Sequence, residues 1–440
     1  KLEVAKLYSM LEGDAGVTSM GRTAVDNQTV RTVFIIRPDK RIGLFLTYPM
    51  ATGRNFLEIL RAIDSMQMTA KHKVATPANW KKGEDVIIVP AVKDEEAKKL
   101  FPKGWKALNE LAELLEAPVT TSLGGKSAFS EKHPLSLGSG GRSTTLMVNK
   151  FLQNSDLVFG IGCSFSSTPF GLKIPPEKKI IHATLDSEDI NKNVLAEHAL
   201  LGDARLVLEA LVSEIKERLQ GVSRGRSQKI SGEIQRIKSD WIKQWNPKLN
   251  SSEQPISPYR VIWDLMKTVD LPNTIITHDS GSPRDQLSPF WESVTPLSYI
   301  GWGKSTQLGY GLGLAMGAKL AQPDKLCINV WGDAAIGFTG TDLETAAREQ
   351  IPILSILLNN FCMAVELPYY PAATEKYRVT DISGNYARMA NSLGCYSERI
   401  EKPSEIVSAL KRGIRKTEEG VPVLLEFITS QETQLSIFDH

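Results

Sequence analysis

Hydrophobic residues in the second half of the chain fall into two alternating patterns. Continuous apolar runs such as KLCINVWGD (325–333) and ILSILLNN (353–360) are typical of strands buried on both faces of a sheet. Runs with apolar residues three and four apart, such as YRVIWDLMKTV (259–269) and SEIVSALKRGIRKT (404–417), are typical of amphipathic helices. Strands that alternate with helices predict an α/β fold built on a parallel sheet.

The same alternation occurs with shorter elements in the middle of the chain. The strands expected there are APVTTSL (117–123), DLVFGIGC (156–163) and KKIIHATLD (178–186). The first hundred residues have a different pattern, with two β-type runs, a helix, an arm punctuated by Pro and Trp, and a charged helix. These elements are TVRTVFIIRP (29–38), RIGLFLTYP (41–49), FLEILRAIDSM (56–66), the arm 74–92 and DEEAKKLF (94–101).

Changes of pattern along the chain predict five stretches. They are an amino-terminal segment (1–106), a first α/β domain (107–216), a charged helix with a linker (217–255), a second α/β domain (256–432) and a tail (433–440). We therefore expect two three-layer domains with parallel sheets, preceded by a separate segment. In such sheets ligands bind outside the carboxyl ends of the strands.

Composition narrows the class of protein. The 440 residues are 42% hydrophobic and 23% charged, which is typical of a globular protein. A net charge of +2 gives no electrostatic reason to expect nucleic acid or a membrane as a partner. No apolar run approaches the ~20 residues of a membrane-spanning helix. The four cysteines have no CxxC spacing and no signal peptide opens the chain, so we expect free thiols and a cytoplasmic location.

The candidate chemistry lies at two strand ends of the second α/β domain. Asp333 follows Gly332, and Asn360 comes 360 − 333 = 27 residues later, at the end of the next apolar run. A carboxylate, an amide oxygen and the backbone carbonyl of Cys362 can serve as oxygen ligands of Mg²⁺, which binds few protein carboxylates together with phosphate oxygens. The N–H groups of Ala334 and Ala335 open the next element and can meet an anion.

A plainer interpretation exists for each part of this pair. A strand-end Asp can cap a helix, and two asparagines can form a turn. The occurrence of both features at this spacing favours a metal site over an unrelated helix cap and turn.

With its surroundings, this pair resembles the signature of thiamine diphosphate-dependent enzymes of the acetolactate synthase and pyruvate decarboxylase superfamily. GWGKSTQLGYGLGLAMGA (301–318) and HDSGSPRDQ (278–286) resemble two further segments of that superfamily. The resemblance implies thiamine diphosphate and Mg²⁺ as cofactors and a 2-oxo acid as substrate. One departure is Ala334, where the family motif usually has Gly.

The resemblance also implies roles for individual residues. Leu308 falls where the family has an apolar wedge that bends the cofactor, and the Thr306 carbonyl falls where the family accepts a hydrogen bond from the aminopyrimidine. Leu308 can alternatively be a core leucine of an amphipathic helix. Glu366 falls on an acid–base glutamate of some decarboxylases. Residues implied to lie near the diphosphate are Ser280, Gly281, Ser282 and Gly332.

Residues 107–216 resemble the central domain of the same superfamily, with its first strand apparently missing. Some members hold FAD in that domain, but no FAD signature occurs here, and the Gly160–Gly162 pair is typical of a strand-to-turn junction. The family's pyrimidine-binding domain, which carries a cofactor-activating Glu, has no counterpart in this sequence.

Residues 1–106 resemble the carboxy-terminal part of a one-cysteine peroxiredoxin, which implies a partial thioredoxin-like fold. Arg54 falls on that family's active-site arginine, but no Cys precedes Cys163. A peroxidase needs a thiolate nucleophile, so we expect this segment to be catalytically inactive by itself. In that family the 74–106 arm packs on a partner subunit, which favours oligomer contacts.

Three hypotheses follow. The first is a thiamine diphosphate- and Mg²⁺-binding lyase or carboligase that works as a homo-oligomer or with a partner chain supplying the pyrimidine domain. The second is a non-catalytic fusion or interaction protein, favoured by the abrupt join within FPKGWKAL (101–108). The third, a peroxidase, is disfavoured by the missing cysteine.

Overall fold

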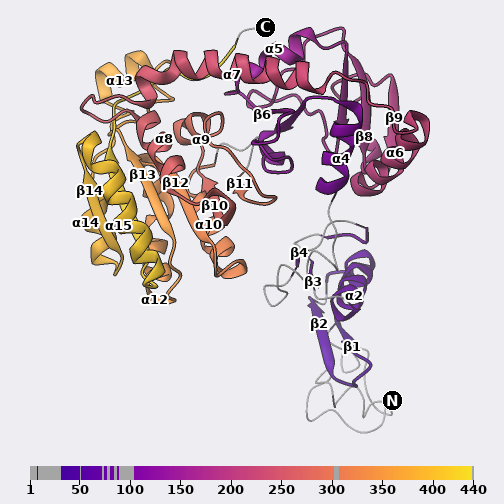
Figure 1. The fold of residues 1–440 in the computed structure, drawn as a ribbon. Coiled ribbons are helices and arrows are strands. Elements are labelled where there is room, and N and C mark those ends of the chain that lie inside the picture. Colours follow the sequence, from indigo (N-terminus) through magenta and orange to yellow (C-terminus); the bar gives the residue numbers. More distant parts are fainter. Residues whose placement is uncertain are drawn as a thin grey trace. The chain divides into compact units, whose positions relative to one another are not determined.

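The computed structural model describes residue 7 and residues 31–49, 51–71, 74–76, 80–83, 87–88, 104–301 and 307–438. The chain divides into two compact units, Lys1–Phe101 and Pro102–His440, which are considered separately (Figure 1). None of the described helices is long and apolar enough to cross a membrane.

The first unit contains a hairpin and a helix. The hairpin pairs β1 (Arg31–Ile36) with β2 (Ile42–Tyr48) in antiparallel fashion, and α2 (Phe56–Lys71) follows. A second antiparallel pair joins β3 (Val74–Ala75) to β4 (Ile87–Ile88). Both β-type runs and the first helix expected here are thus confirmed. The helix expected over 94–101 lies outside the described residues.

The second unit opens with the central α/β region. Its elements are α4 (Trp105–Leu115), β5 (Val119–Ser122), β6 (Ser136–Gly140), α5 (Leu146–Asn154), β7 (Leu157–Ile161), β8 (Lys179–Thr184), β9 (His198–Leu201) and α6 (Ala204–Leu219). All strand pairs are parallel, but they form two separate sheets, β5-β6 and β7-β8-β9. The three strands expected from the sequence are present as β5, β7 and β8.

Helix α7 (Ser227–Leu249) crosses from the central region to the carboxy-terminal domain (Figure 1). Two of its tryptophans pack on Phe290: the Trp241 ring stacks at 4.9 Å, and the Trp245 ring meets it edge-on at 4.9 Å. The cluster around them also holds Val148 of α5. One hydrophobic core therefore continues through both domains.

The carboxy-terminal domain is a parallel sheet covered on both faces. The strand order is β11-β10-β12-β13-β15-β14, and every pair is parallel. The strands are β10 (Thr274–His278), β11 (Tyr299–Ile300), β12 (Leu326–Gly332), β13 (Leu354–Asn359), β14 (Tyr396–Ile400) and β15 (Val423–Ile428). The helices are α8 (Pro258–Thr268), α9 (Ser282–Leu287), α10 (Tyr310–Ala321), α11 (Asp333–Thr339), α12 (Leu343–Arg348), α13 (Pro371–Tyr377), α14 (Tyr386–Ser392) and α15 (Ile406–Glu418).

Two hydrophobic clusters lie on opposite faces of this sheet. One contains Leu265 of α8 and Leu410 of α15. The other contains Leu312 of α10 and Ala390 of α14. The result is the three-layer α/β architecture with a parallel sheet that the alternating pattern predicts, and the fold class is confirmed.

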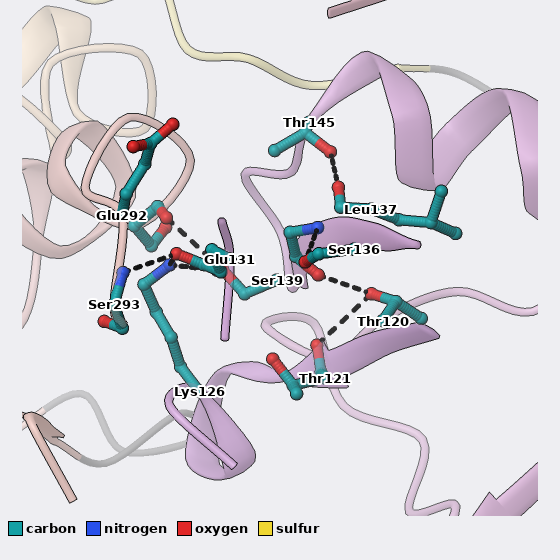
Figure 2. Close-up of polar contacts among 12 residues, drawn as sticks. Thr120, Thr121, Lys126, Glu131, Ser136, Leu137, Ser139, Thr145, Glu292 and Ser293 are labelled. Carbon is teal, nitrogen blue, oxygen red and sulfur yellow. Dashed lines mark hydrogen bonds and ion pairs between the residues drawn. The ribbon is translucent and has the colours of Figure 1, made fainter. Parts of the chain in front are cut away.

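A buried ion pair within the central region contacts the carboxy-terminal domain through its carboxylate (Figure 2). Lys126 Nζ donates to Glu131 Oε2 at 2.6 Å and to Ser139 Oγ at 3.3 Å. The Glu131 carboxylate in turn accepts from the Ser293 N–H at 2.8 Å. The contact thus couples the loop after β5 to the segment that precedes β11.

Candidate functional site

An open pocket with about 590 Å³ of empty space lies at the carboxyl ends of β10, β12 and β13. Because these strands are neighbours in a parallel sheet, the segments that follow them meet at one edge. Every site residue expected from the sequence lines this pocket except Thr306, which lies outside the described residues. They are Ser280, Gly281, Ser282, Leu308, Gly332, Asp333, Ala334, Ala335, Asn360, Cys362 and Glu366.

Asp333 is the first residue of α11 and is 4% exposed. Its Oδ1 accepts from the Ala334 N–H at 2.9 Å, and its Oδ2 accepts from the Cys362 N–H at 3.1 Å. Burial raises the pKa of this carboxyl to about 6, although surrounding backbone N–H groups lower it. Among the described residues no Lys or Arg side chain forms an ion pair with it.

The Asn359–Asn360 pair forms a double turn at the end of β13. Asn359 Oδ1 accepts from the Phe361 N–H at 3.0 Å, and Asn360 Oδ1 accepts from the Cys362 N–H at 2.9 Å. Phe361 has a φ of 58°, so the backbone turns through the left-handed region here. The turn delivers the Asn360 side-chain oxygen to the same N–H group that Asp333 contacts.

Asn359 itself points into the protein. Its Nδ2 donates to Glu426 Oε1 at 2.7 Å, and both residues are fully buried. The first asparagine therefore anchors the turn to β15, while the second faces the pocket.

The remaining oxygen ligand expected from the sequence is the Cys362 carbonyl. It accepts one hydrogen bond, from the Ala364 N–H at 2.9 Å. A carbonyl oxygen has two lone pairs, so this bond leaves capacity for a cation. The Cys362 thiol is buried, and burial raises its pKa.

The backbone groups expected to meet a diphosphate also line the pocket, with one difference. The Ala334 N–H is engaged by Asp333, whereas it was expected to be free for an anion. Gly281 has a φ of 86°, a conformation that favours glycine. At Gly332, which lines the pocket, an added Cβ would lie in ordinary van der Waals contact with Pro283, 3.5 Å away, so packing alone does not require glycine there.

Leu308 precedes α10 and lies outside that helix. Its side chain is half-buried and packs against the hydrophobic cluster that contains Leu312, while it also lines the pocket. The alternative of a core leucine within an amphipathic helix is wrong in detail, because α10 begins only at Tyr310. Glu366 is half-buried and lines the pocket about one turn beyond Cys362.

Asp279 is a buried residue at this site that sequence reasoning missed. Its carboxylate accepts from the N–H groups of Ser280 at 3.0 Å, Gly309 at 2.8 Å and Gly311 at 3.1 Å. It therefore ties the segment after β10 to the start of α10 and places Leu308 beside the pocket. Only its position next to the Ser280–Ser282 segment could have indicated this role.

The site suits a divalent cation on chemical grounds. Burial without a cationic partner disfavours the ionised form of a carboxylate, which is why the pKa of Asp333 is raised. A cation beside Asp333 and Asn360 would remove it, with further oxygen ligands from a phosphate group and water. The described residues contain no cluster of three or more His, Cys, Asp or Glu side chains that could hold a metal ion.

Packing and turn geometry account for the two glycines Gly160 and Gly162 of the central region. An added Cβ at Gly160 would lie 2.1 Å from the Phe165 ring, and Gly162 has a φ of 62°. Both positions need glycine for packing or turn geometry, so they give no support for FAD.

Comparison with known protein families now identifies the class. Residues 100–211 match the thiamine pyrophosphate enzyme central domain, and residues 279–427 match the C-terminal thiamine pyrophosphate-binding domain of the same enzymes. These two segments therefore belong to the thiamine pyrophosphate enzyme family. Residues 65–104 match the C-terminal domain of 1-Cys peroxiredoxin.

Individual relatives agree with this assignment. The chain is 32% identical over 341 residues to a probable acetolactate synthase large subunit of Methanococcus aeolicus, covering 75% of this chain and 56% of the relative. It is 28% identical over 345 residues to an acetolactate synthase of Mycobacterium bovis, covering 74% and 53%. A 1-Cys peroxiredoxin of Dictyostelium discoideum is 49% identical over 116 residues, covering 26% and 44%. The chain thus spans about half the length of the curated relatives it matches.

Proposed function

We propose that the carboxy-terminal domain binds thiamine diphosphate through Mg²⁺. The observation that supports this most directly is the meeting of Asp333 Oδ2 and Asn360 Oδ1 at the Cys362 N–H. Two oxygen ligands from different strands then lie at the mouth of one pocket, next to the backbone of Ser280–Ser282.

Each residue has a proposed task. Asp333, Asn360 and the Cys362 carbonyl hold the cation, and the segments Ser280–Ser282 and Gly332–Ala335 receive the diphosphate. Leu308, which lines the pocket, would pack against the bound cofactor, and the carbonyl of Thr306, which lies outside the described residues, would accept a hydrogen bond from its aminopyrimidine. Glu366 holds or releases a proton near the reacting carbon.

We further propose a reaction class, a lyase or carboligase of the acetolactate synthase type that acts on 2-oxo acids. When bound, the cofactor supplies the nucleophilic carbon and stabilises the carbanion left by decarboxylation. The names of the curated relatives support this class. We also propose that the protein works in the cytoplasm, as a homo-oligomer or with a partner chain that supplies a pyrimidine-binding domain.

Isothermal titration calorimetry tests the binding site. We expect thiamine diphosphate to bind only with Mg²⁺ present, and the Asp333→Ala variant to lose that binding. Asp324, an exposed residue in the turn before β12, provides the matched control, and Asp324→Ala is expected to bind normally. If no binding is detected at ~1 mM cofactor, the binding free energy is weaker than about 4 kcal/mol, and the proposed site is refuted.

A non-catalytic cofactor-binding fusion is the second candidate. The separate amino-terminal unit with its peroxiredoxin match favours it. Pyruvate turnover, measured with the chain alone and with an added pyrimidine-binding partner, separates the two candidates. A peroxidase is not favoured: Arg54 is exposed, and burial raises the pKa of the half-buried Cys163 thiol, the earliest cysteine in the sequence.

A further inference from the structure

Glu426 is a charged residue in the interior of the carboxy-terminal sheet. It belongs to β15, which pairs with β13 on one side and with β14 on the other, and it is fully buried. It is the only Asp, Glu, Lys or Arg residue within the strands β10, β12, β13 and β15. Because burying a carboxylate is costly unless its oxygens accept hydrogen bonds, its donors indicate what it contributes.

One oxygen of this carboxylate acts on the turn that follows β13. Glu426 Oε1 accepts from Asn359 Nδ2 at 2.7 Å, and Asn359 Oδ1 accepts from the Phe361 N–H at 3.0 Å. An amide side chain donates through its nitrogen and accepts through its oxygen, so Glu426 fixes which way the Asn359 amide faces. That amide in turn holds the Phe361 N–H, one residue before the N–H group that Asp333 and Asn360 share.

The other oxygen acts on the start of α14. Glu426 Oε2 accepts from the N–H of Ala387, the second residue of that helix, at 2.9 Å. Residues 361–385, here called the pocket segment, lie between the two attachment points and include Cys362 and Glu366 of the pocket wall. One buried side chain therefore holds both ends of the segment that forms one wall of the candidate site.

The two ends of the pocket segment are also bonded to each other. The Ile382 N–H donates to the Phe361 carbonyl at 3.0 Å. The Met363 N–H donates to the Thr380 carbonyl at 2.8 Å. Cys362 lies between these two bonds, so its carbonyl, the third expected oxygen ligand, moves only if the base of the segment moves.

The backbone at Phe361 is strained and needs support. Its φ of 58° lies in the left-handed region, which a bulky residue adopts only at a cost in free energy. The Arg399 guanidinium lies 5.6 Å from the centre of the Phe361 ring, and Arg399 Nη1 lies 3.7 Å from Glu426 Oε1. Arg399 thus contacts the ring of the strained residue, while Glu426 holds its N–H through Asn359.

We propose that Glu426 is a positioning residue for the Mg²⁺ site. The inference rests on the proposed function, because the turn that Glu426 holds presents Asn360 Oδ1 and the Cys362 carbonyl to the cation. Glu426 lies outside the set of described residues that line the pocket, so it acts through Asn359 and the start of α14. Groups that orient metal ligands commonly change metal affinity about 10–100-fold when they are replaced.

Reversing donors and acceptors tests this role. In Glu426→Gln one acceptor oxygen becomes an NH₂ group, so the Asn359 amide or the Ala387 N–H meets another donor. The exchanged pair Asn359→Asp/Glu426→Gln supplies an acceptor for every donor again. The new amide donates to the new carboxylate, and its oxygen accepts from the Ala387 N–H. The carboxylate at position 359 still accepts from the Phe361 N–H, and the net charge of the chain is unchanged.

Calorimetry on the full chain measures the effect on the metal site. We expect Glu426→Gln to weaken Mg²⁺-dependent binding of thiamine diphosphate at least about tenfold, and the exchanged pair to recover to within about twofold of the wild type. Ser397→Ala is the matched control, because the Ser397 hydroxyl donates to the Ala387 carbonyl at 2.6 Å, and its loss removes a bond to α14 but none to the turn. We expect this control to bind normally, which a general loosening of α14 would not allow.

Hydrogen exchange gives a second readout that needs no cofactor. In Glu426→Gln we expect exchange in segment 359–363 to become at least about tenfold faster, and in the exchanged pair to return to the wild-type rate. Exchange in β12, the neighbouring strand that leads to Asp333, is expected to stay unchanged. Unfolding would speed exchange in both places, so the comparison separates misplacement of the turn from loss of the fold.

A milder variant covers the case in which Glu426→Gln does not fold. The Arg399 side chain is 27% exposed, and Arg399→Met removes its contacts with both Glu426 and Phe361. We expect this variant to fold and to weaken Mg²⁺-dependent binding by about threefold.

Two results would overturn the proposal. One is wild-type binding in a folded Glu426→Gln variant, or in Arg399→Met where Glu426→Gln does not fold. The other is an exchanged pair that binds no better than Glu426→Gln alone or that fails to fold. Failure of the proposed function is distinct, because the wild type then binds no cofactor at all, and segment 359–363 still reports whether Glu426 holds the turn.

Discussion

Asn359 and Asn360 are neighbours in sequence, but their side chains serve different parts of the protein. The first bonds to the buried Glu426, and the second faces the pocket with Asp333. Sequence reasoning identified Asp333 and Asn360 because their types and spacing are unusual. It missed Asp279, whose role depends on backbone groups of Gly309 and Gly311, about thirty residues away along the chain.

The two asparagines should therefore respond differently to alanine. Asn359→Ala leaves the Glu426 carboxylate without its side-chain amide donor, and we expect a loss of ~1–3 kcal/mol in the free energy of unfolding. Asn360→Ala should change stability by less than ~1 kcal/mol but abolish Mg²⁺-dependent cofactor binding. Urea unfolding and calorimetry measure the two effects, and equal loss of stability in both variants would contradict this division.

Protons and Mg²⁺ should compete at Asp333. Its pKa lies at about 6, above the ordinary 3.8, so the carboxyl is ionised at pH 7 and mostly protonated at pH 5. A metal ligand must be deprotonated, so we expect Mg²⁺-dependent binding to weaken by about tenfold between pH 7 and pH 5. Calorimetry across this range measures it, and binding that strengthens toward acid pH would contradict the expectation.

Strands and helices were predicted correctly where their side chains form a clear hydrophobic pattern. Strands β12 and β13 are continuous apolar runs, and both lie where expected. Strand β6, with the sequence SLGSG, has almost no side-chain signal, and β14, YSERI, is a partly polar edge strand. Both were missed because their neighbours, rather than their own side chains, determine their conformation.

Helix α7 depends on a charged cap from another helix. Glu116, at the end of α4, accepts hydrogen bonds from Ser223 Oγ at 2.7 Å and the Gly225 N–H at 2.9 Å, just ahead of α7. The Ser223 bond and neighbouring backbone N–H groups lower the pKa of Glu116 from 4.5 to about 2. The carboxylate at the start of α7 also interacts favourably with the helix dipole.

The lowered pKa predicts an acid-sensitive contribution. A lowered carboxyl pKa stabilises the folded state above pH 4.5, and this stabilisation is lost as pH falls toward 2. We expect Glu116→Gln to lower the melting temperature at pH 7 and to approach the wild type near pH 2. Thermal unfolding followed by circular dichroism measures it, with Glu233→Gln, an exposed residue of α7, as control.

Over the chain as a whole, the two families meet in one polypeptide and the sequence predicted both. What it could not predict was the joint within the second unit, because Lys126 and Glu131 look like ordinary surface charges. In the fold both side chains are almost fully buried. Burial lowers the pKa of Lys126 and raises the pKa of Glu131, which disfavours both charges. The attraction and hydrogen bond between the two side chains oppose this effect.

Breaking this pair should loosen the joint. Lys126→Met leaves the Glu131 carboxylate buried without its partner, and we expect a loss of ~3–5 kcal/mol in the free energy of unfolding. The double variant Lys126→Met/Glu131→Leu removes both charges and should recover most of that loss. Denaturant unfolding measures both, and a double variant less stable than the single one would contradict the argument.

The aromatic core at α7 gives the protein a built-in optical reporter. Five of the eight tryptophans are buried, Trp80, Trp241, Trp245, Trp291 and Trp331, and of these Trp241 and Trp245 contact Phe290 directly. Water reaching these indoles shifts their emission to longer wavelength. If the two domains part before their sheets melt, the emission shifts while the far-ultraviolet circular dichroism persists. A single sample can therefore distinguish separation of the domains from unfolding within them.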